Sequence, residues 1–180
     1  MALPSIIYRA ELQFADIDRG VYETLQSTVA QHPSETRERL VARLLALALF
    51  YEPGITFTKG LCAADEPDLW VVGPDGRARL WVEVGLPEAD RIIRAVRHAE
   101  RVALLPCGRG LPVWEQQHLP RLTAMGNLVV AHIDQKFIAV LASRLERVIA
   151  WSITITEGTA YLTVGAETFE TFVRVKKGAS

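Results

Sequence analysis

Cysteine is scarce in this 180-residue sequence, which contains only Cys62 and Cys107. The two residues lie far apart in the chain and form no CxxC pair, so the pattern argues against a disulfide framework and against a redox or zinc function. We expect both thiols to be reduced and buried as small apolar groups.

Long hydrophobic runs are also missing. The longest, residues 44–50, lies between Arg43 and Glu52 and is far shorter than the roughly 20 residues needed to cross a bilayer. Near the start of the chain, Arg9 and Glu11 come before the apolar core of a signal peptide could form. We therefore expect no membrane span, no membrane partner and a cytoplasmic location.

The chain has no excess of either charge, with 20 Lys and Arg against 21 Asp and Glu and a net charge of −1. Nothing attracts the whole molecule to nucleic acid, so such binding would need a local basic face. Hydrophobic residues make up 49% of the chain and charged residues 23%, a balance typical of a folded globular protein. At this length we expect a single domain over residues 1–180.

The two ends of the chain show strand patterns. Residues 5–15 alternate between polar and apolar positions, and residues 21–31 are rich in β-branched and aromatic positions, so we expect a hairpin over residues 1–31 with its turn at 16–20. Residues 150–176 contain two or three short strands, with turns at Glu157-Gly158 and Gly165-Ala166. We expect these two regions to form one antiparallel β unit.

The central residues 34–147 alternate between helical and strand patterns. Pro33 and Ser34 are expected to open the first helix, with Ser34 as its N-cap and Glu35 in its first turn. Strand patterns lie at residues 55–58, 68–72, 79–84, 102–107 and 127–133, and the later helices are expected near 87–100, 112–125 and 135–147. The order α-β-β-β-α-β-α-β-α is typical of an α/β core that contains parallel strands.

Two acidic residues interrupt strand patterns that are otherwise apolar. Asp68 follows Pro67 at the start of the 68–72 strand, and Glu83 lies inside the 79–84 strand. An unpaired charge is costly in a dry interior, so each carboxylate must be protonated, paired or bound to a cation. We interpret the two acids as a divalent metal site. The alternatives are a turn residue for Asp68 and an outward-facing residue of a half-exposed strand for Glu83.

The sequence resembles the bacterial YaeQ family in three blocks: HPSETRERL at 32–40, FTKGLCAADEPDLW at 57–70 and LWVEVGLPEADR at 80–91. With the two terminal β regions, the resemblance covers essentially the full chain. The Pro-Asp element followed by an acid on the next strand also resembles the PD-(D/E)XK nuclease-like superfamily. These resemblances imply an α/β (α+β) fold, in which a restriction-endonuclease-like core with a mixed central sheet carries the antiparallel terminal unit.

The superfamily resemblance also assigns roles to individual residues. Asp68 and Glu83 match its two catalytic acids, and Glu38, in the first helix, matches an acid that often completes the metal site. Three carboxylates suit Mg²⁺ or Mn²⁺, which prefer oxygen ligands. Glu38 has no basic residue three or four positions further on, which favours a role in tertiary structure over that of a solvated helix acid.

The lysine of the motif is missing, because its position holds Gly85. Another cation would have to replace it, and Arg94 is the first candidate. Lys59, just ahead of the Pro-Asp segment, is the second. These two residues therefore join Asp68 and Glu83 as candidate catalytic residues.

A basic face is expected on the 87–100 helix. Arg91, Arg94 and His98 follow i, i+3 and i+7 spacing and so share one side of the helix. This face is a candidate nucleic-acid-binding surface. The alternative is an exposed face whose charge is balanced by the acidic residues around it.

Two functions fit these patterns. The first is a Mg²⁺-dependent nuclease-like phosphodiesterase acting on DNA or RNA, with Asp68 and Glu83 at its centre. The second is a non-catalytic adaptor, in which a degenerate nuclease scaffold binds nucleic acid, the transcription machinery or another protein. Gly85 and the near-zero net charge favour the second function. The sequence does not determine the oligomeric state.

Overall fold

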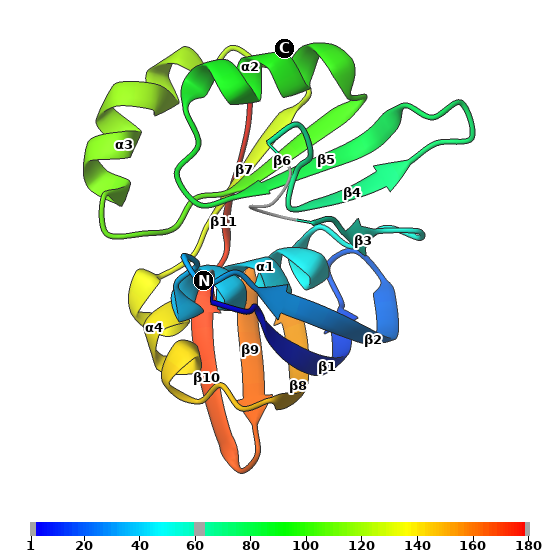
Figure 1. Cartoon of the computed structure of the whole chain (residues 1–180), viewed down its shortest axis with the longest axis vertical. Coiled ribbons are helices and arrows are strands. Elements are labelled where there is room, and N and C mark those ends of the chain that lie inside the picture. The colour runs from blue at the N-terminus through cyan, green and yellow to red at the C-terminus, as the bar shows by residue number, and fades with distance from the viewer. Residues whose placement is uncertain (1–2, 60–63, 179–180) are drawn as a thin grey trace. The chain divides into compact units, whose positions relative to one another are not determined.

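The computed structural model describes residues 3–59 and 64–178, and Figure 1 shows the course of the chain. The chain forms two compact units, one made of Met1–Val41 and Ile133–Arg174 and the other of Ala42–His132 and Val175–Ser180. The expected 135–147 helix thus groups with the two chain ends rather than with the central strands. None of the helices in the described residues is long and apolar enough to cross a membrane.

The first unit contains a five-stranded sheet in the order β10-β9-β8-β1-β2. Strands β1 (Ile6–Asp16) and β2 (Val21–Gln31) pair antiparallel along their whole length, from Ile6 opposite Gln31 to Asp16 opposite Val21. This confirms the predicted hairpin. The side chains of Tyr8, Ala10, Leu12 and Phe14 are buried on one face, as the alternating pattern requires.

The C-terminal strands of this sheet are β8 (Val148–Thr156), β9 (Thr159–Val164) and β10 (Glu167–Phe172). Gly158 and Gly165, at the two predicted turns, both have positive φ angles, which glycine adopts without strain. The expected all-antiparallel unit is wrong, because β1 and β8 pair in parallel. The last strand, β11 (Arg174–Lys177), does not join this sheet either but adds to the sheet of the second unit.

The parallel contact follows from the connection between the strands. Parallel neighbours need a crossover rather than a tight turn. Here the chain that leaves the hairpin passes through residues 42–132 of the second unit and then through α4 (Gln135–Ser143) before β8 begins. Asp134 caps α4, since its Oδ1 accepts a hydrogen bond from Lys136 N at 2.9 Å.

The second unit contains a six-stranded sheet in the order β11-β7-β6-β5-β4-β3. Its remaining strands are β3 (Thr56–Phe57), β4 (Leu69–Val72), β5 (Ala78–Val84), β6 (Arg101–Leu105) and β7 (Leu128–His132). β3, β4 and β5 pair antiparallel, whereas β5, β6 and β7 pair in parallel. The predicted mixed central sheet is therefore confirmed, and with the first sheet it makes a mixed α+β fold.

Helices α2 (Ala89–His98) and α3 (Leu111–His118) lie on one face of this sheet (Figure 1). Their apolar residues pack with those of the strands into one buried cluster, which includes Ile92, Ala95, Val102, Leu104, Trp114, Leu128 and Val130. The predicted 112–125 helix is shorter than expected, because α3 ends at His118 and a single 3₁₀ turn, Leu119–Arg121, follows. Pro120 has no backbone N–H with which to continue an α-helix.

Helix α1 (Arg37–Leu49) begins later than predicted. Thr36 caps it, because Thr36 Oγ1 accepts a hydrogen bond from Arg39 N at 3.1 Å. The assignment of Ser34 as N-cap is wrong, since the Ser34 hydroxyl lies 2.6 Å from His32 Nδ1 instead. Glu35 consequently precedes the helix, where its carboxylate pairs with Arg39 NH1 at 2.9 Å.

Candidate functional site

Asp68 and Glu83 lie close together at the junction of β4 and β5. In the antiparallel register Leu69 faces Val82 and Trp70 faces Trp81, so Asp68 immediately precedes one member of a strand pair and Glu83 immediately follows the other. One backbone bond and one bond to the side chain hold Asp68 against β5: Asp68 N donates to Val82 O at 3.0 Å, and Val84 N donates to Asp68 Oδ2 at 2.8 Å. The charge of Asp68 acts on the Glu83 carboxyl, because like charges at short range repel.

Both acids are buried, with exposed fractions of 2% for Asp68 and 4% for Glu83. The outward-facing alternative for Glu83 is therefore wrong. Burial raises the pKa of the Glu83 carboxyl above its ordinary value of 4.5, and the charge of Asp68 raises it further. The charge of Arg91 and the hydrogen bond from Trp81 oppose this change without cancelling it.

The cation that contacts Glu83 is Arg91, in the first turns of α2. Arg91 Nε lies 2.8 Å from Glu83 Oε1, and Trp81 Nε1 donates to the same oxygen at 2.8 Å. The other two guanidinium nitrogens of Arg91 donate to backbone oxygens, NH1 to Ala64 and NH2 to Glu66, the latter at 2.7 Å. Every nitrogen of this guanidinium thus binds a group of the protein itself.

The other candidate residues of the second unit, Lys59, Arg94 and His98, form no ion pair with either acid within the described part of the chain. Lys59 and Arg94 are both exposed, and neither forms an ion pair with a described acidic residue. His98 is exposed in the last turn of α2. Glu38 is exposed in the α1 segment that belongs to the first unit. Their proposed roles remain predictions.

Gly85, at the position of the missing lysine, has a φ angle of +104°. L-residues with a side chain avoid this region, so glycine suits the local backbone and a lysine would be strained there. The residue also continues the edge of β5, since Gly85 N donates to Leu105 O at 3.1 Å and Gly85 O accepts from Cys107 N at 3.3 Å. Cys107 itself is buried, as expected, whereas Cys62 lies outside the described residues.

A divalent metal does not fit this arrangement of side chains. Among residues 3–59 and 64–178, no three His, Cys, Asp or Glu side chains are grouped so that they could hold a metal ion. The Glu83 oxygen that faces α2 already accepts two hydrogen bonds, one of them from a cation. Arg91 and Trp81, which both donate to this oxygen, thus hold Glu83 in an internal ion pair.

Sequence reasoning missed two of these contacts. The bond from the Trp81 indole to the Glu83 carboxylate was not predicted. The spacing of two residues, which brings side chains to one face of a strand, was the signal that could have indicated it. Arg91 was expected to face nucleic acid, whereas its guanidinium binds Glu83 and the 64–66 segment.

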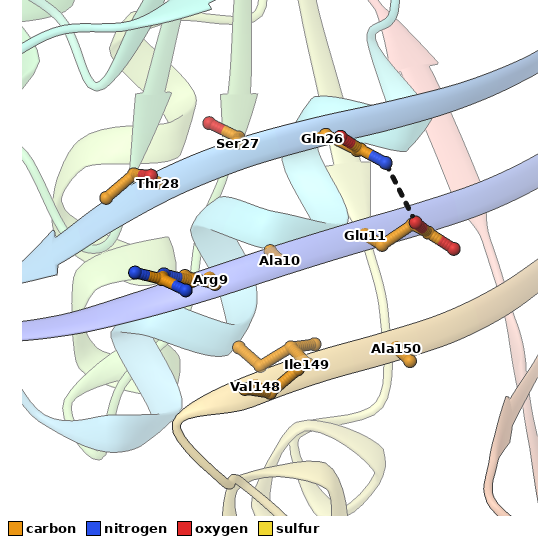
Figure 2. A pocket seen from close by; sticks show the side chains of 9 residues that line it. All are labelled: Arg9, Ala10, Glu11, Gln26, Ser27, Thr28, Val148, Ile149 and Ala150. Carbon is orange, nitrogen blue, oxygen red and sulfur yellow. Dashed lines mark hydrogen bonds between the residues drawn. The ribbon is translucent and has the colours of Figure 1, made fainter.

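A hollow of about 430 Å³ lies over strands β2, β1 and β8 of the first unit (Figure 2). Its lining includes Arg9, Glu11, Gln26, Thr28 and Val148. Gln26 Nε2 donates to Glu11 Oε2 at 3.0 Å, which ties the two strands across the hollow. One cation and one acid line it, with no pair of buried carboxylates, so the Asp68 and Glu83 pair is the stronger candidate site.

Comparisons with known proteins match this chain to one family along almost its whole length. The family model described as "YaeQ protein" matches residues 1–173. The "Uncharacterized protein YaeQ" of Escherichia coli (strain K12) is 37% identical over 163 residues, which cover 90% of each chain, and that of Salmonella typhi has the same identity and coverage.

Two crystal structures have closely similar folds. YaeQ protein from Pseudomonas syringae is 41% identical, with a TM-score of 0.91 and 99% of each chain covered. YaeQ protein from Xanthomonas axonopodis pv. citri is 32% identical, with a TM-score of 0.91, and the match covers 97% of this chain and 99% of that one. The chain therefore belongs to the YaeQ family.

Proposed function

We propose that this protein is a non-catalytic nucleic-acid-binding protein built on a degenerate nuclease-like scaffold. The observation that carries the proposal is the Arg91 guanidinium, whose three nitrogens bind Glu83, Ala64 and Glu66. In a restriction-endonuclease-like core, the two neighbouring acids would hold a divalent ion. Here Arg91 already pairs with one of these acids, Glu83. The position of the motif lysine is held by Gly85, which has a positive φ angle.

The outward side of α2 is the proposed binding surface. Arg94, Arg97 and His98 are exposed there, and no ion pair joins either arginine to an acidic residue in the described part of the chain. Basic residues outnumber acidic ones in the second unit, whereas acids are in excess in the first. An arginine face on a basic unit suits the phosphate backbone of DNA or RNA, even though the whole chain has a net charge of −1.

Binding of fluorescent single-stranded and duplex oligonucleotides, followed by anisotropy between about 50 and 200 mM salt, tests this proposal. We expect the Arg94→Glu/Arg97→Glu variant to bind at least roughly tenfold more weakly and with a shallower salt dependence. The matched control is Arg77→Glu/Arg79→Glu, which makes the same charge change at the start of β5 in the same unit and should bind like the parent. Equal losses in both variants, or no binding to any oligonucleotide, would contradict the proposed surface.

The two buried, neighbouring acids favour one second candidate, a Mg²⁺-dependent phosphodiesterase. In that case Asp68 and Glu83 would hold Mg²⁺ or Mn²⁺, with Glu38 as a third ligand and Arg94 or Lys59 as the replacement cation, and Arg91 would have to leave Glu83. Incubation of oligonucleotides with Mg²⁺ or Mn²⁺ distinguishes the candidates. Metal-dependent cleavage that is lost in both Asp68→Asn and Glu83→Gln would establish the phosphodiesterase and overturn the non-catalytic proposal.

A further inference from the structure

Strand β2 is a long, open edge of the five-stranded sheet in the first unit. It stands at the end of the strand order, so β1 is its only strand neighbour within the described residues (Figure 1). It runs for 11 residues and contains one charged residue, Glu23, with no lysine and no proline. An edge of this kind offers unpaired backbone groups to a further strand.

The other sheet edges in the described part of the chain are protected against such pairing. β10 has six residues, two of them glutamates, and β11 has four residues, three of them basic. β3 has only two residues. Short length and charged side chains are the usual means by which an edge strand avoids pairing, and β2 has little of either protection. β2 is therefore the edge best suited to receive another strand.

Even-numbered residues of β2 point their backbone groups outward, away from β1. The amides of Arg9 and Ile17 donate to carbonyl oxygens of the 147–155 segment, at 2.9 and 2.8 Å, so odd-numbered residues along β1 bond toward β8. Because the bonding direction alternates along a strand, even-numbered residues of β1 bond toward β2, where they are opposite odd-numbered residues. The outward groups of β2 therefore include those of Tyr22, Thr24, Gln26 and Thr28.

These four residues carry no charge. Tyr22 is 64% exposed, and Thr24, Gln26 and Thr28 are exposed as well. Gln26 and Thr28 also line the hollow over β2, β1 and β8 (Figure 2). The backbone groups that a further strand would bond thus lie beside polar, uncharged side chains, which do not repel a strand of the same composition.

The sequence of β2 is nearly symmetric about Leu25. Val21 and Val29 lie four positions to either side of it, and every residue between carries a hydroxyl, amide or carboxyl group. When two copies of the strand run antiparallel with Leu25 opposite Leu25, apolar residues meet apolar residues, and the one charged residue meets a hydroxyl rather than its own copy. The pairs are Val21–Val29, Tyr22–Thr28, Glu23–Ser27, Thr24–Gln26 and Leu25–Leu25.

We propose that β2 pairs antiparallel with β2 of a second copy of this chain, about a two-fold axis at Leu25, and so forms a homodimer. In this register each even-numbered residue meets an even-numbered residue, so the outward backbone groups of the two strands bond each other. The inference does not depend on the proposed function, because β2 belongs to the first unit and α2 to the second.

Sedimentation equilibrium of the full chain at increasing concentration tests the dimer. The measured mass should rise from that of one chain, 20.0 kDa, towards twice that value. A parent chain that remains at 20.0 kDa up to about 1 mM would overturn the proposal.

Two double variants that differ only at position 22 test the register. Tyr22→Glu/Thr28→Glu places like charges opposite each other in both Tyr22–Thr28 pairs, whereas Tyr22→Lys/Thr28→Glu places opposite charges there. We expect the dissociation constant of the first variant to be at least roughly tenfold higher, with a smaller difference at high salt. Position 22 is opposite Ala15 within the chain, so neither charge there faces another charge on β1. Equal dissociation constants would overturn the register.

Cysteine cross-linking tests the position of the axis. In Leu25→Cys the two sulfurs belong to directly opposed residues at a non-hydrogen-bonded position, where Cα atoms are about 4.5 Å apart, so a disulfide between copies should form under mild oxidation. Ser27→Cys is the matched control, because its two copies would lie roughly 13 Å apart along the strands, too far for a disulfide. Both variants also carry Cys62→Ser, and Cys107 is buried. Equal cross-linking in both, or none in Leu25→Cys, would overturn the pairing about Leu25.

Discussion

The Nε atom of Arg91 lies 2.8 Å from Oε1 of Glu83, and this contact joins α2 to β5. The side chain of Glu83 is only 5% exposed, whereas that of Arg91 is 28% exposed, so the carboxylate depends on the arginine more than the arginine depends on it. A charge this deeply buried loses its solvation, and the ion pair and the indole bond of Trp81 replace only part of it.

Removal of Arg91 should therefore destabilise the protein strongly. We expect Arg91→Met to lower the free energy of unfolding by about 2–3 kcal/mol, because it leaves Glu83 buried without its cation. Urea unfolding at neutral pH measures this change. Arg94→Met, one turn further along the same helix and exposed, is the matched control and should change stability by less than about 0.5 kcal/mol. Similar losses in both variants would show that the ion pair is energetically unimportant.

The raised pKa of Glu83 predicts a specific dependence of stability on pH. Burial makes the native state hold this proton more tightly than the unfolded chain does, so between pH 4.5 and the raised pKa the native state binds more protons. The contribution of Glu83 to stability therefore falls as pH rises through that window and increases as pH is lowered through it.

Comparison with Glu83→Gln isolates this contribution. The difference in unfolding free energy, parent minus variant, should shift in favour of the parent as the pH is lowered from 7.5 towards 4.5. Urea unfolding at several pH values in that range measures it. A difference that shifts in favour of the variant on acidification would mean that the pKa is lowered instead and that Arg91 outweighs burial.

Local patterns in the sequence predicted most elements of the fold but not how the strands combine. The alternation in residues 5–15 and 21–31 defined the β1–β2 hairpin, because a short turn leaves one pairing available. Alternation says nothing about which distant strand becomes a neighbour or in which direction it runs. The parallel pairing of β1 with β8 and the departure of β11 for the other sheet could not be predicted for that reason.

Capping of α1 illustrates how two adjacent local signals compete. Ser34 and Thr36 are both good N-cap residues, and only Thr36 bonds the helix backbone, at Arg39 N. We expect Thr36→Ala to lower the free energy of unfolding by about 1 kcal/mol, as measured by urea unfolding. Ser34→Ala is the matched control and should cost clearly less, because its hydroxyl binds His32 rather than the helix. A larger loss for Ser34→Ala would restore Ser34 as the functional cap.

The candidate site was also predictable only in part. Asp68 and Glu83 stood out because charges interrupt apolar strand patterns, and both proved to be buried. The cation was not predictable from helical periodicity, which places Arg91 and Arg94 on one face but does not say which side chain turns inward. Arg91 does so because it lies in the first turns of α2, where the chain has just left β5 and the Glu83 carboxylate is within reach.

Gly85 provides the last prediction, since its φ angle of +104° is costly for any residue with a Cβ. Gly85→Ala should lower the free energy of unfolding by about 1–2 kcal/mol. Gly110→Ala is the control, because Gly110 has a φ of −84° and an added Cβ would meet Leu86 Cδ1 at an ordinary 3.5 Å, so its loss should be smaller. Gly85→Lys should have the same backbone strain as Gly85→Ala. It should create no Mg²⁺-dependent cleavage of oligonucleotides, because Arg91 would still pair with Glu83. If Gly85→Lys produced such cleavage, the acids would be competent to bind metal as they stand, and the missing lysine alone would separate this chain from a nuclease.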